Sequence, residues 1–153
     1  HESAHATDYI ARLTPYPEPE LLKIQGYQPA GSYQAITEPF WAGYDQPAPT
    51  INWPYRGRVS FYGLGGGPKL RASEAVDVYR ALQATPFVSL YATKNWAEDF
   101  ADLFAFSSLV NQLRCPYRIT VEDGASRFSY EPLAEPSVKQ RDHSLRTLWT
   151  TLP

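Results

Sequence analysis

The longest helical pattern in the chain, at residues 95–113, constrains the fold most. Its apolar residues recur at positions 96, 100, 103 and 104 and beyond, the spacing of one face of an α-helix. Three other stretches, 1–13, 73–84 and 136–152, also have the character of helices. The chain is therefore expected to be mainly helical.

Strand signals are few and short. Residues 117–121 and 127–131 flank Asp123-Gly124, a dipeptide typical of hairpin turns. Alternation at 58–64 predicts a further short strand, and residues 87–91 favour an extended stretch. We therefore expect an α+β fold that is mainly helical, with a small β-hairpin.

Residues 15–57 have a different composition from the rest of the chain. Pro, Gly, Tyr and Trp recur there without a helical or strand period. Disordered segments are normally depleted in aromatic residues, so this segment is expected to be ordered and packed. Trp41, Tyr44 and Trp53 could line a substrate cleft and bind an extended peptide, or they could form local core.

Size and charge narrow the class of protein. The chain has 153 residues, of which 43% are hydrophobic, enough for one compact domain over 1–153. A net charge of −2 and the lack of a basic run argue against a nucleic-acid partner. Apolar stretches such as 103–110 are shorter than the roughly 20 residues that span a bilayer. The lone Cys115 cannot form an internal disulfide and does not indicate a compartment.

The first five residues, His1-Glu2-Ser3-Ala4-His5, form an H-E-x-x-H motif. On a helix, residues i and i+4 share a face, so both imidazoles can reach one cation. Such a pair suits Zn²⁺, and Glu2 could take a proton from a water that the metal has acidified. The alternative is that these residues lie on a solvated helix face by chance.

A catalytic zinc site needs a third protein ligand. His143 is one candidate, but Glu98 is the better one, because Asp102 follows it by one helical turn and could accept the other N–H of a ligating imidazole. The alternative is structural, since Asn95 and Glu98 also have the spacing of a capping box at a helix start.

These residues resemble a known family. H-E-x-x-H with a Glu from a later helix resembles the gluzincin arrangement, and YATKNWAEDFADLF resembles the third-ligand helix of the lethal-factor-like and Pro-Pro endopeptidase group of bacterial zinc peptidases. In that group a Tyr precedes the ligand Glu by seven residues, as Tyr91 precedes Glu98 here. Acidic residues match at Asp102 and Asp8, and the resemblance covers only these two segments.

The resemblance implies a secreted, zinc-dependent endopeptidase with a zincin-like domain that acts on a protein or peptide. His1, His5 and Glu98 would hold Zn²⁺, with Glu2 as general base and Tyr91 donating a hydrogen bond to the oxyanion. 

Asp8 lies three residues after His5. It could orient an imidazole, or it could be an ordinary surface carboxylate on the helix.

The chain departs from the family in two ways. The interval between His5 and Glu98 is longer than in that group, so 15–57 is interpreted as an insertion. Zincin domains also place a sheet before the H-E-x-x-H helix, and its edge strand pairs with substrate. We therefore expect an upstream segment or a second chain to complete the domain.

Two other functional classes remain open. An N-terminal His1 could chelate copper through its α-amine and imidazole together with a second His, as in copper oxidases that cut polysaccharides. A degenerate peptidase could instead be a non-catalytic binding module, although intact Glu2 and Tyr91 argue against that.

Overall fold

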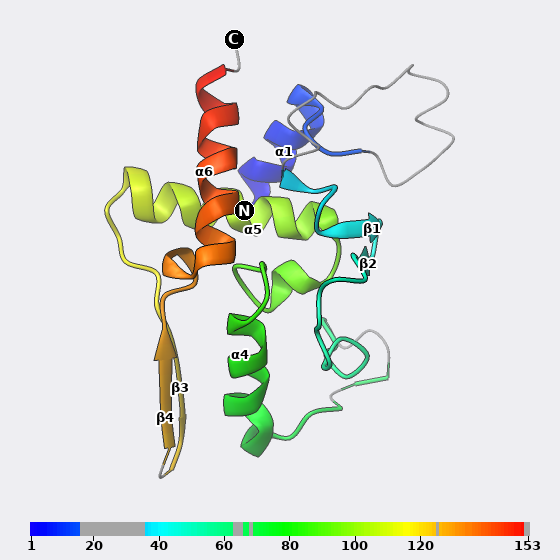
Figure 1. The fold of residues 1–153 in the computed structure, drawn as a ribbon, viewed down its shortest axis with the longest axis vertical. Helices are drawn as coiled ribbons and strands as arrows, with labels where there is room; N and C mark the ends of the chain where they lie inside the picture. The colour runs from blue at the N-terminus through cyan, green and yellow to red at the C-terminus, as the bar shows by residue number, and fades with distance from the viewer. Residues whose placement is uncertain (16–35, 63–65, 68, 125, 152–153) are drawn as a thin grey trace.

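The computed structural model describes residues 1–15, 36–62, 66–67, 69–124 and 126–151. Its α-helices over these ranges are α1 (Glu2–Ala11), α4 (Ala75–Gln83), α5 (Trp96–Ser107) and α6 (Pro136–Thr151). Its strands are β1 (Trp41–Gly43), β2 (Gln46–Pro47), β3 (Ile119–Asp123) and β4 (Ser126–Tyr130), paired antiparallel as β1–β2 and β3–β4. The fold is α+β and mainly helical, as predicted (Figure 1).

Helix α5 lies at the centre of the fold, where α1 and α6 both pack against it (Figure 1). It buries Phe100, Ala101 and Leu103. Beyond Ser107 the chain continues as one π-helical turn, Ser108–Gln112. The predicted helix at 95–113 is confirmed, with a wider last turn than an α-helix has.

Helix α1 ends in a turn that reverses the chain. Arg12 follows it in the left-handed conformation, with a φ of 55°. The Asp8 carboxylate then accepts hydrogen bonds from the backbone N–H and the hydroxyl of Thr14, both at 2.6 Å. This reversal buries Leu13 in the core, while Ile10 stays 80% exposed.

The segment at 36–57 contributes directly to the core. Trp41 and Trp53 are buried, so for these two residues the interpretation as local core is confirmed. Tyr44 is 38% exposed and packs edge to face on Trp96. Residues 16–35 of the predicted insertion lie outside the described residues. The core cluster consists of Leu13, Ile36, Trp41, Trp53, Val78, Leu82, Phe87, Val88, Ala92, Phe100, Leu103, Val138, Leu145 and Leu148.

The predicted strand at 58–64 is wrong for its described residues, 58–62. The N–H groups of Arg58 and Val59 both donate to the Tyr55 carbonyl, so they form a turn instead of a ladder. Residues 63–64 lie outside the described residues.

The predicted extended stretch at 87–91 is also wrong. The Ser89 hydroxyl accepts the N–H of Ala92 at 2.9 Å, which folds the chain into bends and the 3₁₀ turn η2 (Tyr91–Thr93). A side chain that binds nearby backbone in this way competes with a strand.

The predicted hairpin is confirmed as β3–β4, with Asp123 paired to Ser126. Asp123 therefore belongs to the strand, and the turn begins at Gly124, whose φ of 51° a glycine adopts without strain. No helix in the described parts of the chain combines the length and the apolar character that crossing a membrane requires.

Candidate metal centre

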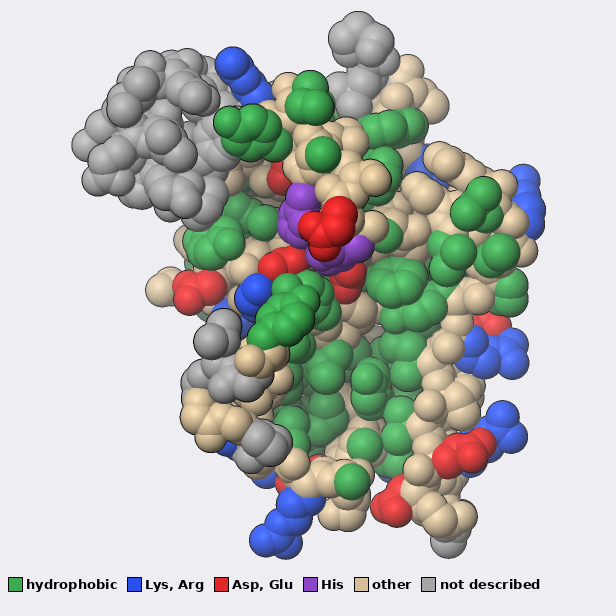
Figure 2. All heavy atoms as spheres, turned by 180° about the vertical axis from the view of Figure 1, so that it is seen from behind, with side chains coloured by type: hydrophobic (Ala, Val, Ile, Leu, Met, Phe, Trp, Pro, Cys, Tyr) green, Lys and Arg blue, Asp and Glu red, His purple; other side chains and the backbone are tan. Residues whose placement is uncertain are grey.

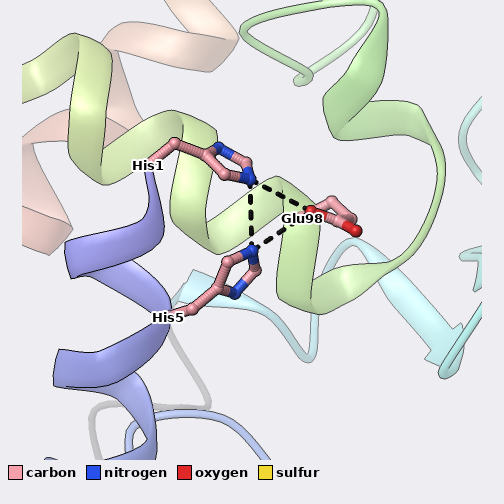
Figure 3. Close-up of side chains that lie close together, drawn as sticks. All are labelled: His1, His5 and Glu98. Carbon is pink, nitrogen blue, oxygen red and sulfur yellow. Dashed lines mark hydrogen bonds and ion pairs between the residues drawn. The ribbon is translucent and has the colours of Figure 1, made fainter.

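His1 and His5 lie one helical turn apart at the start of α1. His1 is the N-cap residue, and its carbonyl accepts the N–H of His5 at 3.2 Å. Their Nε2 atoms are 3.1 Å apart, with the two rings nearly perpendicular at 85° (Figure 3). The i, i+4 spacing therefore directs both imidazoles to one point.

Glu98 reaches the same point from the first turn of α5. Its Oε2 lies 3.2 Å from His1 Nε2 and 3.2 Å from His5 Nε2, so the three atoms form a nearly equilateral triangle (Figure 3). His143 is exposed on α6 and does not belong to the group. The structure thus brings together His1, His5 and Glu98, the three residues chosen as ligands.

Asp102 determines which nitrogen of the His1 imidazole carries the proton. Its Oδ1 lies 2.7 Å from His1 Nδ1, and its Oδ2 accepts a hydrogen bond from the Ser89 hydroxyl. A carboxylate only accepts hydrogen bonds, so Nδ1 carries the proton, and in the neutral ring Nε2 presents a lone pair. Asp102 therefore makes the expected contact to a ligating imidazole.

The donor set fits a divalent metal ion. His1 Nε2 and Glu98 Oε2 lie 3.2 Å apart, close enough for both to bind one cation or for a protonated imidazole to donate to the carboxylate. Ligands about 2.0–2.1 Å from a tetrahedral zinc ion are about 3.3 Å from one another, close to the sides of this triangle. Two imidazole nitrogens and one carboxylate oxygen are a common donor set for catalytic zinc.

The second oxygen of Glu98 has other partners. Oε1 accepts hydrogen bonds from the Tyr91 hydroxyl and from Lys94 Nζ, both at 2.8 Å. Burial pushes the Glu98 pKa upward, but these hydrogen bonds and the charges of Lys94 and His5 outweigh it and hold the pKa below its usual value. Glu98 therefore stays ionised at neutral pH. Burial, with the neighbouring Tyr62 and Glu98, raises the Tyr91 pKa far above its usual range, so the phenol stays protonated.

The interpretation of Asn95 and Glu98 as a capping pair is confirmed in part. The Asn95 side chain caps α5 by accepting the backbone N–H of Glu98 at 2.9 Å. The Glu98 side chain does not complete a capping box, because it turns toward the imidazoles and Lys94. The cap at Asn95 therefore leaves the Glu98 carboxylate free to point toward α1.

Glu2 and Asp8 have different surroundings. Glu2 is exposed in the first turn of α1, and its carboxylate has no hydrogen bond or ion pair within the described ranges. Asp8 does not hydrogen-bond to His5 as proposed from the sequence. It is buried, and both of its oxygens accept from Thr14, so it holds the end of the helix.

A buried ion pair fixes the orientation of α5 and was not predicted. Asp99 and Arg141 are each 1% exposed, with guanidinium-to-carboxylate distances of 2.6 and 3.0 Å. Trp41 Nε1 also donates to Asp99, at 2.7 Å. The partners are 42 residues apart, and no local pattern connects them. Because Asp99 is anchored toward α6, its neighbour Glu98 faces α1.

Arg56, from the segment at 36–57, holds the turn that carries Tyr91 and Lys94. Its guanidinium donates to the carbonyls of Asp45, Thr93 and Lys94. A second link joins the same segment to the start of α5, since the N–H of Trp96 donates to the Tyr44 carbonyl at 3.0 Å. The described part of the predicted insertion therefore holds the turn at 91–94 and the start of α5, the two segments that carry Tyr91, Lys94 and Glu98.

The histidine side chains reach the surface close to acidic side chains and above a broad apolar area (Figure 2). No family model, no curated protein and no solved structure matches this chain. The site itself and the two motifs are therefore the features that indicate the class of protein.

Proposed function

We propose that the protein is a zinc-dependent endopeptidase. The observation that carries the proposal is the convergence of three potential ligand atoms, His1 Nε2, His5 Nε2 and Glu98 Oε2, at mutual distances of 3.1 to 3.2 Å. Two elements far apart in sequence supply them, and Asp102 fixes the tautomer of one imidazole. The substrate would be a protein or peptide outside the cell.

Each residue has a role that its surroundings support. Zinc bound by these ligands supplies Lewis acidity, which polarises a carbonyl and acidifies water. Glu2, exposed and unpaired in the described part of the chain, accepts the proton of the attacking water and passes it to the leaving amine. Tyr91 donates a hydrogen bond to the developing oxyanion once its hydroxyl leaves Glu98.

The copper alternative has less support from the geometry. Chelation by an N-terminal histidine pairs the α-amine with Nδ1 of the same residue, because Nε2 is too distant to close a small ring. His1 Nδ1 is instead bonded to Asp102, while Nε2 faces His5 and Glu98. Zinc uptake with peptide cleavage, and no copper-dependent redox activity, is the expected result.

The test compares wild type with Glu2→Gln on a peptide library, with and without stoichiometric Zn²⁺. Both should bind zinc, while cleavage by Glu2→Gln should fall by about 10²–10⁴-fold, the usual contribution of a general base. Glu122→Gln is the matched control, since Glu122 is an exposed carboxylate on the remote hairpin. Equal cleavage by wild type and Glu2→Gln would reject Glu2 as the base, and no zinc uptake would reject the metal centre.

A further inference from the structure

Lys94 is the only Lys or Arg, among the described residues, whose side chain forms an ion pair with the His1, His5 and Glu98 cluster. Its Nζ lies 2.8 Å from Glu98 Oε1 and 3.1 Å from the Tyr91 hydroxyl. The Lys94 side chain is 32% exposed and that of Glu98 is 14% exposed. The pair is thus partly shielded from solvent, where a charge-assisted hydrogen bond is stronger than at an open surface.

The position of Lys94 is held by its own surroundings. Its N–H donates to the Tyr91 carbonyl at 3.0 Å, and its carbonyl accepts from Arg56 at 3.0 Å. Its ammonium lies 5.0 Å from the ring centre of Tyr91 and 5.7 Å from that of Tyr62. These contacts fix a long side chain that would otherwise sample many rotamers.

The two oxygens of Glu98 have different sets of partners. Oε2 faces the imidazoles, and Oε1 is bonded to Lys94 and Tyr91. A carboxylate can bind a metal through one oxygen or two. With Oε1 held, Glu98 would ligate a metal ion through one oxygen, which would leave a fourth position open, as catalytic zinc requires.

Tyr91 cannot hold Oε1 and also donate its single proton to a reacting carbonyl. When Tyr91 turns to substrate, Lys94 is the donor that remains on Oε1. We propose that Lys94 is a positioning residue that keeps Glu98 a one-oxygen ligand and so frees Tyr91 for the substrate. This inference rests on the proposed peptidase function and adds a residue to it.

The test uses Co²⁺ in place of zinc, because the visible spectrum of Co²⁺ reports its coordination number. Wild type should show the intense bands of a four-coordinate ion, and Tyr91→Phe should keep them because Lys94 remains. In Lys94→Met the Tyr91 hydroxyl can still donate to Oε1, so the double variant Lys94→Met/Tyr91→Phe is compared with Tyr91→Phe. The double variant leaves Oε1 free to join the metal, and its band intensity should fall by more than about half relative to Tyr91→Phe. The variant Lys94→Arg/Tyr91→Phe should keep most of the intensity, and Lys139→Met, at an exposed lysine on α6, should match wild type.

Each result decides one question. If Lys94→Met/Tyr91→Phe binds one Co²⁺ with the spectrum of Tyr91→Phe, the role of Lys94 is rejected while the peptidase proposal stands. If wild type takes up neither Co²⁺ nor Zn²⁺, the metal centre and the role of Lys94 are rejected together. Circular dichroism checks folding, and Lys94→Leu, which also lacks a donor, replaces Lys94→Met if the double variant is unfolded, with the same expected loss and the same rejecting result.

Discussion

Glu98 and Asp99 are neighbours on α5, yet their carboxylates have opposite surroundings. Asp99 points into the core, where the guanidinium of Arg141 contacts both of its oxygens. Glu98 points toward α1, where one oxygen is bonded to Lys94 and the other faces two imidazole nitrogens. Successive helical residues point about 100° apart, so two adjacent acids can serve different parts of the molecule.

The difference separates a structural carboxylate, Asp99, from Glu98, which we propose binds a metal ion. The countercharge of Asp99 is part of the chain, and the pair is closed to solvent. The countercharge of Glu98 on the Oε1 side is Lys94, whereas Oε2 faces the two imidazoles, and we propose that a metal ion binds there. Two measurements test this distinction, and a third tests a buried group that carries no charge.

The largest expected effect is on stability. Asp99→Asn leaves the Arg141 cation buried without its countercharge, and breaking a buried pair in this way costs about 3–5 kcal/mol of unfolding free energy. Urea unfolding of the metal-free protein measures the loss. The control is Asp77→Asn, which removes an exposed partner of Arg80 and should change stability by less than about 1 kcal/mol. Similar losses for both variants would contradict a structural role for Asp99.

The second effect is on metal affinity. Glu98→Gln removes one of three ligands, and since loss of a supporting residue alone costs 10–100-fold, we expect zinc affinity to fall by more than about 100-fold. The metal-free unfolding free energy should change by less than about 1 kcal/mol, because the amide oxygen of the new Gln can still accept hydrogen bonds from Tyr91 and Lys94. Competition with a fluorescent zinc chelator gives the affinity. Unchanged affinity with intact folding would remove Glu98 from the ligand set.

The smallest expected effect is on the stability contributed by Tyr130, whose buried hydroxyl is uncharged. The Tyr130 hydroxyl has no hydrogen-bond partner in the structure as described, and burial, then Tyr117, Tyr79 and Glu135, raise its pKa. The folded chain therefore keeps Tyr130 protonated at a pH where the unfolded chain ionises. Its contribution to stability is complete below about pH 10 and is lost as the pH rises above that.

Tyr130→Phe should accordingly leave stability at pH 7 within about 1 kcal/mol of wild type. Between pH 9 and pH 11, its unfolding free energy should fall less steeply than that of wild type. Urea unfolding across this pH range measures both quantities. A clear loss of stability at pH 7 would show that the hydroxyl has a stabilising partner.

Most of the helical fold could be predicted because its signals are local. The period at 95–113 and the Asp123-Gly124 turn each depend on residues close in sequence, and both elements are present. The strands β1 and β2, of three and two residues, are too short to produce a pattern. The expected strand at 58–64 failed over 58–62 because turn hydrogen bonds take up the backbone donors there.

The candidate site could be predicted in part. His1 and His5 follow from helical spacing, and Glu98 and Asp102 from their spacing within one motif. Lys94 precedes Glu98 by four residues, the spacing of an ion pair on one helix face, but it lies before the start of α5 at Trp96, so the helical pattern at 95–113 does not include it. Asp8 satisfied the spacing rule for an imidazole partner and instead binds Thr14, because the chain reverses after Arg12.

By itself the sequence determined what depends on neighbours within about one helical turn: the helices, the hairpin and the pairing of two imidazoles on one face. The motif had indicated Glu98, but only tertiary structure brings α5 to those imidazoles with Glu98, and not Asp99, facing them. That choice depends on the rotation of the helix, which Asp99 and Arg141 set through a contact between residues 42 positions apart. Local periodicity carries no information about such a contact, because it is formed only when α5 and α6 pack together.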